Sequence, residues 1–158
     1  MIFSTARGPA LAAIRAARTE EVTPIDATRT PGGTGLRFWR PDGLERWPWL
    51  EALVTTRDGG TSGGPFASLN LGLASGDEAE RVLANRERLR RALGLGAAQI
   101  HALHQVHGTR ILEAPWSGGE DGDGSWTRHA EVVLAVGIAD CVPVFVWDAS
   151  LRRIALVH

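Results

Sequence analysis

The chain has 158 residues, of which 44% are hydrophobic, and its formal net charge is −1, so it fits one domain with a real core and not a disordered chain. All 17 basic residues are arginine, which excludes a Schiff-base lysine or a phosphate-binding P-loop lysine in this chain. No basic block occurs, which argues against binding to a nucleic-acid backbone. The single cysteine, Cys141, excludes an internal disulfide, and no apolar run approaches the roughly 18 residues of a membrane span.

The N-terminal residues 1–35 are expected to form a poorly ordered leader before the domain. Within this leader, residues 9–21 are rich in alanine and favour a short helix with Pro9 in its first turn. Residues 23–35 contain two prolines and two adjacent glycines, which is typical of a loop or linker. The domain itself is then expected over residues 36–158.

One helix and several strands are expected within the domain. Apolar residues recur at helical spacing over residues 78–93, with Asp77 as a cap and Gly94 just beyond the end. Short apolar runs, often β-branched, predict strands at residues 36–39, 51–56, 100–106, 109–113, 131–138, 144–147 and 154–157. Residues 117–125 are rich in glycine and acids but lack the calcium-ligand pattern of an EF-hand, so we expect a solvated loop. A single helix beside these strands is consistent with an α+β domain built on a mixed sheet.

Three residues that can bind a transition metal lie where predicted strands break or end, namely His107, Cys141 and His158. Imidazole nitrogen and thiolate sulfur are ligands that zinc prefers, and three protein ligands leave a fourth position open, as in catalytic sites. The residues alone also allow structural roles. Cys141 could be a small buried hydrophobic residue, His107 a turn residue bonded to a carbonyl, and His158 a frayed end. Spacing therefore leaves the metal site undecided.

A series of short motifs follows the chain in order from residue 55 to residue 158. They are TTRDGGTS at 55–62, SLNLG at 68–72, GD at 76–77, NR at 85–86, QVHG at 105–108, DG at 123–124 with Thr127, ADCVP at 139–143 and VH at 157–158. In this order and combination they resemble the laccase-domain family, also called multicopper polyphenol oxidase-like or YfiH-like proteins, over about residues 53–158. The resemblance implies a layered mixed β-sheet with flanking helices. It also implies that the fold is incomplete at the C-terminus, so that residues 36–158 form the N-terminal portion of the family's domain.

The resemblance also implies a metal site and an activity. In that family the histidine of QVHG, the cysteine of the ADC motif and a later histidine bind zinc, and these correspond to His107, Cys141 and His158. The family's activity is phosphorolysis of adenosine, inosine and related nucleosides, together with deamination of adenosine. We therefore expect a zinc-dependent purine nucleoside phosphorylase with adenosine deaminase activity, whose small-molecule partners are purine nucleosides and phosphate.

Candidates for binding phosphate cluster around the Gly-rich loop. Arg57 offers a bidentate fork, to which hydroxyls and loop amides add donors, and it is also a candidate for catalysis. The full candidate set is Arg57, Ser62, Ser68, Asn70 and Arg86. For Asn70 in a turn and Arg86 on the helix, a purely structural role is an equal alternative.

Asp140 and two further histidines complete the set of candidates. Asp140 precedes the cysteine and is expected to orient a ligand or, as a catalytic residue, to act as a base. His101 and His104 lie outside the family's motifs, so neither is expected to bind the metal. His101 is the better candidate to support a ligand.

Three other functions are compatible with the same residues. A copper-dependent polyphenol oxidase is suggested by the family's name. It is compatible with the residues because a His/Cys/His site has a higher affinity for Cu²⁺ than for Zn²⁺. An inactive truncated fragment or binding module is suggested by the chain's ending on the last ligand. A cysteine hydrolase would use Cys141 with His107 or His158. Under each reading a cytoplasmic location without membrane or nucleic-acid partners is expected.

Overall fold

The computed structural model describes residues 10–16, 35–96 and 100–158, whose strands form two sheets. In spatial order, the first sheet contains β2 (Phe38–Trp39), β3 (Leu50–Thr55), β1 (Ala10–Ala16), β7 (Val133–Ile138) and β4 (Ile100–Ala102). The second contains β5 (Ile111–Glu113), β6 (Gly124–Thr127), β9 (Arg153–Val157) and β8 (Val144–Asp148). The helices are α1 (Ala79–Ala92) and three short 3-10 turns, η2 (Leu44–Arg46), η3 (Gly64–Phe66) and η4 (Leu73–Ser75).

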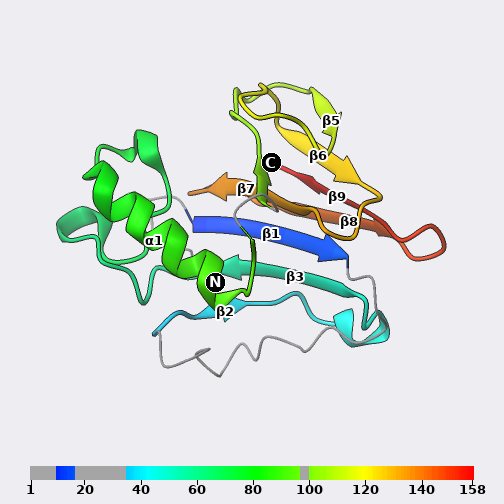
Figure 1. The fold of residues 1–158 in the computed structure, drawn as a ribbon, viewed down its shortest axis with the longest axis horizontal. Coiled ribbons are helices and arrows are strands. Elements are labelled where there is room, and N and C mark those ends of the chain that lie inside the picture. Colours follow the sequence, from blue (N-terminus) through cyan, green and yellow to red (C-terminus); the bar gives the residue numbers. More distant parts are fainter. Residues whose placement is uncertain (1–9, 17–34, 97–99) are drawn as a thin grey trace.

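Both sheets are mixed, as expected for this α+β fold. The β4–β7 and β5–β6 pairs are parallel, and the other strand pairs are antiparallel. In Figure 1, α1 lies at the left, with its lower end in front of the left-hand ends of β1 and β3, while β9 packs against β1 and β7. The described elements therefore form three layers: a helix, the five-stranded sheet and the four-stranded sheet.

Two hydrophobic cores hold these layers together. Between the two sheets, alternate residues of β1 such as Ile14 pack with Leu134 of β7 and Leu156 of β9, all at most 1% exposed. On the other face of the first sheet, Leu53 and Val133 pack under Leu89 of α1. The central sheet is thus buried on both faces, which explains why β7 is an almost continuous apolar run.

The prediction of a helix at residues 9–21 is wrong where the structure describes it, because residues 10–16 form β1. This strand pairs with β3 on one side and β7 on the other, with Ala13 opposite both Leu53 and Ala135. Alanine favours helices only weakly, and here small side chains fit between two packed layers while both edges of the backbone are paired. The expected leader is therefore also wrong for these residues. Residues 1–9 and 17–34 lie outside the described part.

Most of the remaining predictions agree with the structure, although β6 was not predicted as a strand. The helix and the strand positions after residue 36 are confirmed, although β4 ends at Ala102 and not at residue 106. Gly94 is left-handed with a φ of 64°, as a helix terminator should be. Asp77 does not occupy the cap position, which falls on Glu78, although its Oδ1 accepts the Glu78 amide at 2.8 Å. The predicted loop at 117–125 overlaps the start of β6.

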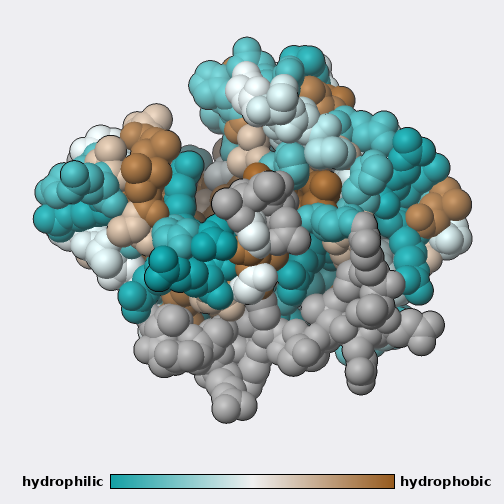
Figure 2. Space-filling model, viewed as in Figure 1, coloured by the Kyte–Doolittle hydropathy of each residue, from teal (hydrophilic) through white to brown (hydrophobic). Residues whose placement is uncertain are grey.

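The outer face of the second sheet exposes apolar side chains. Along β8, Phe145 and Trp147 pack against the core between the sheets, while Val144 and Val146 on the other face are each 50% exposed. Figure 2 shows a mostly hydrophilic surface from the front, with hydrophobic patches on the lobe before α1 and at the β8–β9 hairpin. Within the described residues, no helix is both long and apolar enough to cross a membrane.

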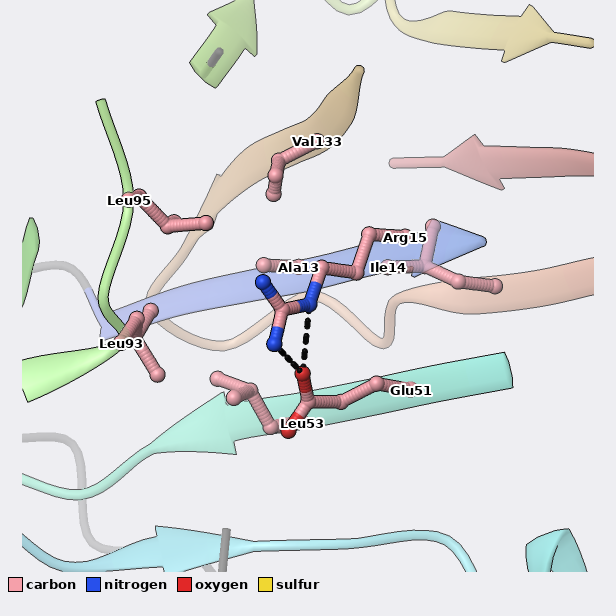
Figure 3. Close-up of a pocket in the computed structure, with 8 residues that line it drawn as sticks. All are labelled: Ala13, Ile14, Arg15, Glu51, Leu53, Leu93, Leu95 and Val133. Carbon is pink, nitrogen blue, oxygen red and sulfur yellow. Dashed lines mark hydrogen bonds and ion pairs between the residues drawn. The ribbon is translucent and has the colours of Figure 1, made fainter. Parts of the chain in front are cut away.

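A buried carboxylate joins the edge of the first sheet. Glu51 on β3 is 5% exposed and accepts Arg15 Nε from β1 at 2.6 Å and Arg40 Nη2 at 2.9 Å. Figure 3 shows the Arg15–Glu51 pair among apolar side chains of the sheet, including Leu53 and Val133, and of the segment after α1, namely Leu93 and Leu95. The cavity lined by these residues has a volume of about 10 Å³. It holds at most one water molecule, so it is not a nucleoside pocket.

We expect Glu51→Gln to lower the free energy of unfolding by about 2 kcal/mol, because two arginines lose their shared counter-charge in a mostly buried position. Urea unfolding followed by circular dichroism measures this loss. Glu113→Gln is the matched control, since Glu113 on β5 pairs with Arg128 at 3.4 Å and both side chains are well exposed. Its loss should stay below about 0.5 kcal/mol. Equal losses in the two variants would show that burial adds nothing to the Glu51 pairs.

Candidate metal centre

His107 lies on an exposed bend between β4 and β5. Its backbone is left-handed with a φ of 57°, which is uncommon for a residue other than glycine. The amides on either side of it, from Val106 and Gly108, donate to the same oxygen, Asp123 Oδ2, at 3.1 and 2.7 Å. One carboxylate oxygen therefore fixes the bend that presents the imidazole.

Gln105, in the same QVHG motif, ties this bend to β7. Its Nε2 donates to the Gly137 carbonyl at 2.9 Å, and the Gly137 amide donates back to Gln105 Oε1 at 2.7 Å. This pair of bonds imitates a strand pairing. Because β7 ends at Ile138, just before Cys141, these two hydrogen bonds place the bend beside the segment that carries the thiol.

The other two predicted ligands follow strand ends. Cys141 lies between β7 and β8, is exposed, and has its Sγ 3.8 Å from Asp140 Oδ1. His158 follows β9, and its side chain is only 8% exposed. The His158 amide donates to the Asp123 carbonyl at 2.7 Å, and its Nδ1 lies 3.0 Å from Asp123 Oδ1.

The structure brings these three predicted ligands together. One potential ligand atom from each of His107, Cys141 and His158 lies within 4.8 Å of the other two. The two imidazole rings meet edge to face, with centroids 5.0 Å apart and planes at 73°. Two imidazole nitrogens and one thiolate sulfur suit Zn²⁺, and they also suit Cu²⁺. The geometry thus defines a candidate site for one transition-metal ion without fixing which ion.

Asp123 is the residue of this centre that the sequence prediction missed. It lies in the segment expected to be a solvated loop, yet it is 3% exposed. Burial opposes its ionisation, but hydrogen bonds from the Gly108 amide, the His158 ring and the Val106 amide outweigh this and lower the pKa of Asp123 to about 2. Its one signal in the sequence is the DG motif at 123–124, whose glycine begins β6.

Most of the predicted phosphate-binding residues belong to a network that shapes the Gly-rich loop. The centre of this network is Asn85 of α1, which is 0% exposed. Its Nδ2 donates to Ser62 Oγ and to the Ser68 and Asn70 carbonyls, and its Oδ1 accepts from the Thr61 amide. The folded loop therefore depends on these hydrogen bonds from a buried helix residue. It also requires glycine at position 60, where a Cβ would lie 2.0 Å from the Ser68 carbonyl oxygen.

The side chains of Ser62, Ser68 and Asn70 take part in this network. Ser62 accepts from Asn85, as above. Ser68 Oγ accepts the Gly60 amide at 3.1 Å and donates to the Arg57 carbonyl at 2.8 Å. Asn70 Nδ2 donates to Ser75 Oγ and Asp77 Oδ2 at 2.7 and 3.0 Å. These contacts give the three residues a role in holding the loop.

The two predicted arginines are each anchored to a backbone carbonyl. Arg57 Nη2 donates to the Pro65 carbonyl at 3.1 Å on the exposed side of the loop. Arg86 Nε donates to the Leu71 carbonyl at 2.7 Å, which connects α1 to the segment before it. Arg57 is thus the candidate that lies nearest to solvent within the Gly-rich loop.

The remaining two candidate histidines do not join the cluster of three. The His101 ring packs edge to face against Trp116, with centroids 5.3 Å apart. His104 Nδ1 lies 2.8 Å from Asp121 Oδ1, and both side chains are exposed. Both rings thus have other partners, and the expectation that neither residue binds the metal stays a prediction.

These features describe a layered α+β domain with a His/Cys/His candidate metal centre at its strand ends. A family model described as multi-copper polyphenol oxidoreductase laccase matches residues 51–158, and the chain belongs to this family. The resemblance drawn from the motifs is therefore confirmed.

Several relatives carry the name purine nucleoside phosphorylase. One from Deinococcus radiodurans is 42% identical over 104 residues, which cover 66% of this chain and 41% of the relative. YlmD from Geobacillus stearothermophilus is 36% identical over 133 residues, which cover 77% of this chain and 48% of the relative.

Two solved structures resemble the fold of this chain. The crystal structure of YlmD matches with a TM-score of 0.62 at 37% identity, covering 66% of this chain and 43% of that one. A Neisseria meningitidis protein matches with a TM-score of 0.62 at 29% identity, covering 92% of this chain and 49% of that one. The chain thus spans less than half the length of these relatives.

Proposed function

We propose that the chain carries the N-terminal portion, over residues 36–158 and strand β1, of a zinc-dependent purine nucleoside phosphorylase that also deaminates adenosine. The observation that carries this proposal is the convergence of His107, Cys141 and His158 within 4.8 Å. The names of the relatives support the substrate class, namely purine nucleosides and phosphate. Because the chain spans less than half of those relatives, we assign the activity to the domain as a whole, including the portion that they contain and this chain does not.

Zinc is the metal that we assign to the centre. One thiolate and two imidazoles form a ligand set typical of catalytic zinc, with a fourth position left for water or substrate. When bound, zinc supplies Lewis-acid chemistry suited to attack on an electron-poor purine carbon. Copper is the competing metal, since the same ligands bind it tightly.

We assign the phosphate contact to Arg57. A guanidinium anchored at one nitrogen to the Pro65 carbonyl is held in place and still offers other N–H donors to an anion. Ser62, Ser68 and Asn70 support this contact by holding the loop, and Arg86 by joining α1 to it. We assign Asp140, whose carboxylate lies beside the Cys141 thiol, to orient this ligand.

A metal analysis combined with a nucleoside panel tests the proposal. We expect close to one zinc per chain after purification without added metal, and conversion of adenosine and inosine that depends on phosphate for phosphorolysis. The panel should be run on this chain and on a fusion of it to the portion of YlmD that this chain does not match. We expect the activity in the fusion and its loss on chelation.

Each alternative predicts a different result. Copper with little zinc would replace the metal assignment and favour the oxidase. Activity that resists chelators but is lost in Cys141→Ser would favour a cysteine hydrolase. If the zinc-loaded fusion converts neither adenosine nor inosine, with or without phosphate, the proposed substrate class is wrong.

A further inference from the structure

The Asp123 carboxylate contacts the segments of both histidines of the metal centre, namely the His158 ring and the two backbone amides that flank His107. Asp123 Oδ1 lies 3.0 Å from His158 Nδ1, and Oδ2 accepts the two amides that flank His107. The Asp123 carbonyl also accepts the His158 amide at 2.7 Å. The side chains of Asp123 and His158 are only 4% and 8% exposed, so water competes little for these bonds. Asp123 therefore connects the bend after β4 with the end of β9.

The chemistry of a carboxylate determines which ring nitrogen of His158 carries the proton. An ionised carboxylate only accepts hydrogen bonds, so the nitrogen facing it, Nδ1, must be the donor. In a neutral imidazole the other nitrogen, Nε2, then keeps its lone pair, which is the form that binds a metal. A carboxylate in this position also fixes the orientation of the ring.

We propose that Asp123 is the positioning residue that assembles the metal centre. It keeps His158 in the Nδ1–H tautomer, which leaves Nε2 for the metal, and it fixes the left-handed bend that presents His107. This inference rests on the metal-dependent function proposed above and adds to it the residue that organises the site before a metal arrives.

The substitution Asp123→Asn separates this role from simple space filling. Asparagine has the same shape but only one acceptor oxygen, and its NH₂ group donates. If the oxygen faces His158, the NH₂ group meets the Val106 and Gly108 amides. If it faces these amides, the NH₂ group meets His158 Nδ1–H. Either orientation sets a donor against a donor, so one of the two histidine supports is lost.

Asp121 provides a matched control in the same segment. Its Oδ1 lies 2.8 Å from His104 Nδ1, so it makes the same kind of contact as Asp123. The two side chains are 62% and 75% exposed, and His104 is not part of the metal cluster. Asp121→Asn therefore makes the same chemical change without touching the supports of the site.

The first measurement is zinc affinity, obtained by competition with a chromophoric chelator. We expect Asp123→Asn to bind zinc about 10–100-fold more weakly than the wild type, as is typical when a carboxylate behind a ligating histidine is lost. Asp121→Asn should stay within about twofold of the wild type. Circular dichroism of each variant shows whether it is folded at the assay temperature.

The second measurement reads the tautomer directly, first in the wild type and then in Asp123→Asn. Long-range ¹H–¹⁵N correlation spectra of the metal-free wild type should show His158 with its proton on Nδ1. In Asp123→Asn this preference should weaken, whereas a purely structural role for Asp123 would leave the tautomer unchanged.

The proposal is overturned if wild-type His158 carries its proton on Nε2, or if folded Asp123→Asn binds zinc as tightly as the wild type. Neither result depends on nucleoside turnover. Zinc-dependent turnover with unchanged affinity in Asp123→Asn would contradict the positioning role and leave the proposed function intact. Weakened zinc binding in Asp123→Asn, together with no nucleoside turnover even in the zinc-loaded wild type, would support the positioning role and contradict the proposed function.

Discussion

Replacing Cys141 with alanine is expected to lower the affinity for zinc by more than about 100-fold. The Cys141 Sγ is one of three potential ligand atoms that lie within 4.8 Å of one another, and even the loss of a hydrogen bond behind a ligand typically costs about 10–100-fold. Because Cys141 is exposed, the stability of the metal-free chain should change by less than about 0.5 kcal/mol. Chelator competition measures the affinity, and urea unfolding of the metal-free chain measures the stability.

His104→Ala is the control for this experiment. It removes an exposed imidazole that lies only three positions before His107 but outside the cluster, so zinc affinity should be unchanged. Equal zinc affinity in Cys141→Ala and the wild type would mean that the thiol is not a ligand. Strong loss in both variants would mean that His104 participates, contrary to the geometry.

Asn85→Ala is expected to reduce the free energy of unfolding by about 4 kcal/mol, a large effect for one side chain. The Asn85 side chain is completely buried and makes five hydrogen bonds to the Gly-rich loop, to Thr61, Ser62, Ser68 and Asn70. Alanine leaves these loop groups without their partner inside the protein, and each such group costs about 1–3 kcal/mol. Urea unfolding followed by tryptophan fluorescence measures the change.

Two further variants isolate the cause of this loss. Leu83→Ala lies on the same helix with 55% of the residue exposed, and its effect should be below about 1 kcal/mol. Asn85→Asp preserves the shape but turns a carboxylate oxygen toward two carbonyls and a hydroxyl, so it should destabilise as strongly as alanine. If Asn85→Asp were as stable as the wild type, the hydrogen-bond pattern would not be what holds the loop.

The metal-ligand candidates were found from motifs, and the fold explains why spacing alone was not enough. His107, Cys141 and His158 follow three different strands, β4, β7 and β9, that belong to two sheets. No local pattern marks ligands of this kind, because sheet packing brings their strand ends together. The sequence indicated such ends for Cys141 and His158, which follow apolar runs, whereas β4 already ends at Ala102, well before His107.

The surroundings of Asp123 were predicted incorrectly because a sequence does not show which side of a loop faces inward. An aspartate within a Gly-rich acidic segment predicts a solvated position, yet Asp123 is buried by the end of β9 and by the bend after β4. The assignment of Ser62 and Asn70 to phosphate stays a prediction. The sequence does not show that the Ser62 hydroxyl and the Asn70 backbone carbonyl accept from the buried amide of Asn85.

The first strand escaped prediction for a different reason. Residues 10–16 contain four alanines, which indicate a helix by local preference and carry no clear period of two. The decisive information is the narrow space between α1 and β9 and the two neighbouring strands with unpaired edges. These are properties of the folded partners, so no local reading of the segment contains them.

The backbone at His107 gives a way to recognise the site without reference to any metal. A left-handed conformation costs a residue with a Cβ about 1 kcal/mol, and glycine adopts it without this cost. A sequence optimised only for the stability of this backbone would therefore place glycine at position 107. Arg152 in the turn between β8 and β9 has a left-handed backbone too, with a φ of 49°, so the conformation of His107 points to a site only together with its convergence with Cys141 and His158.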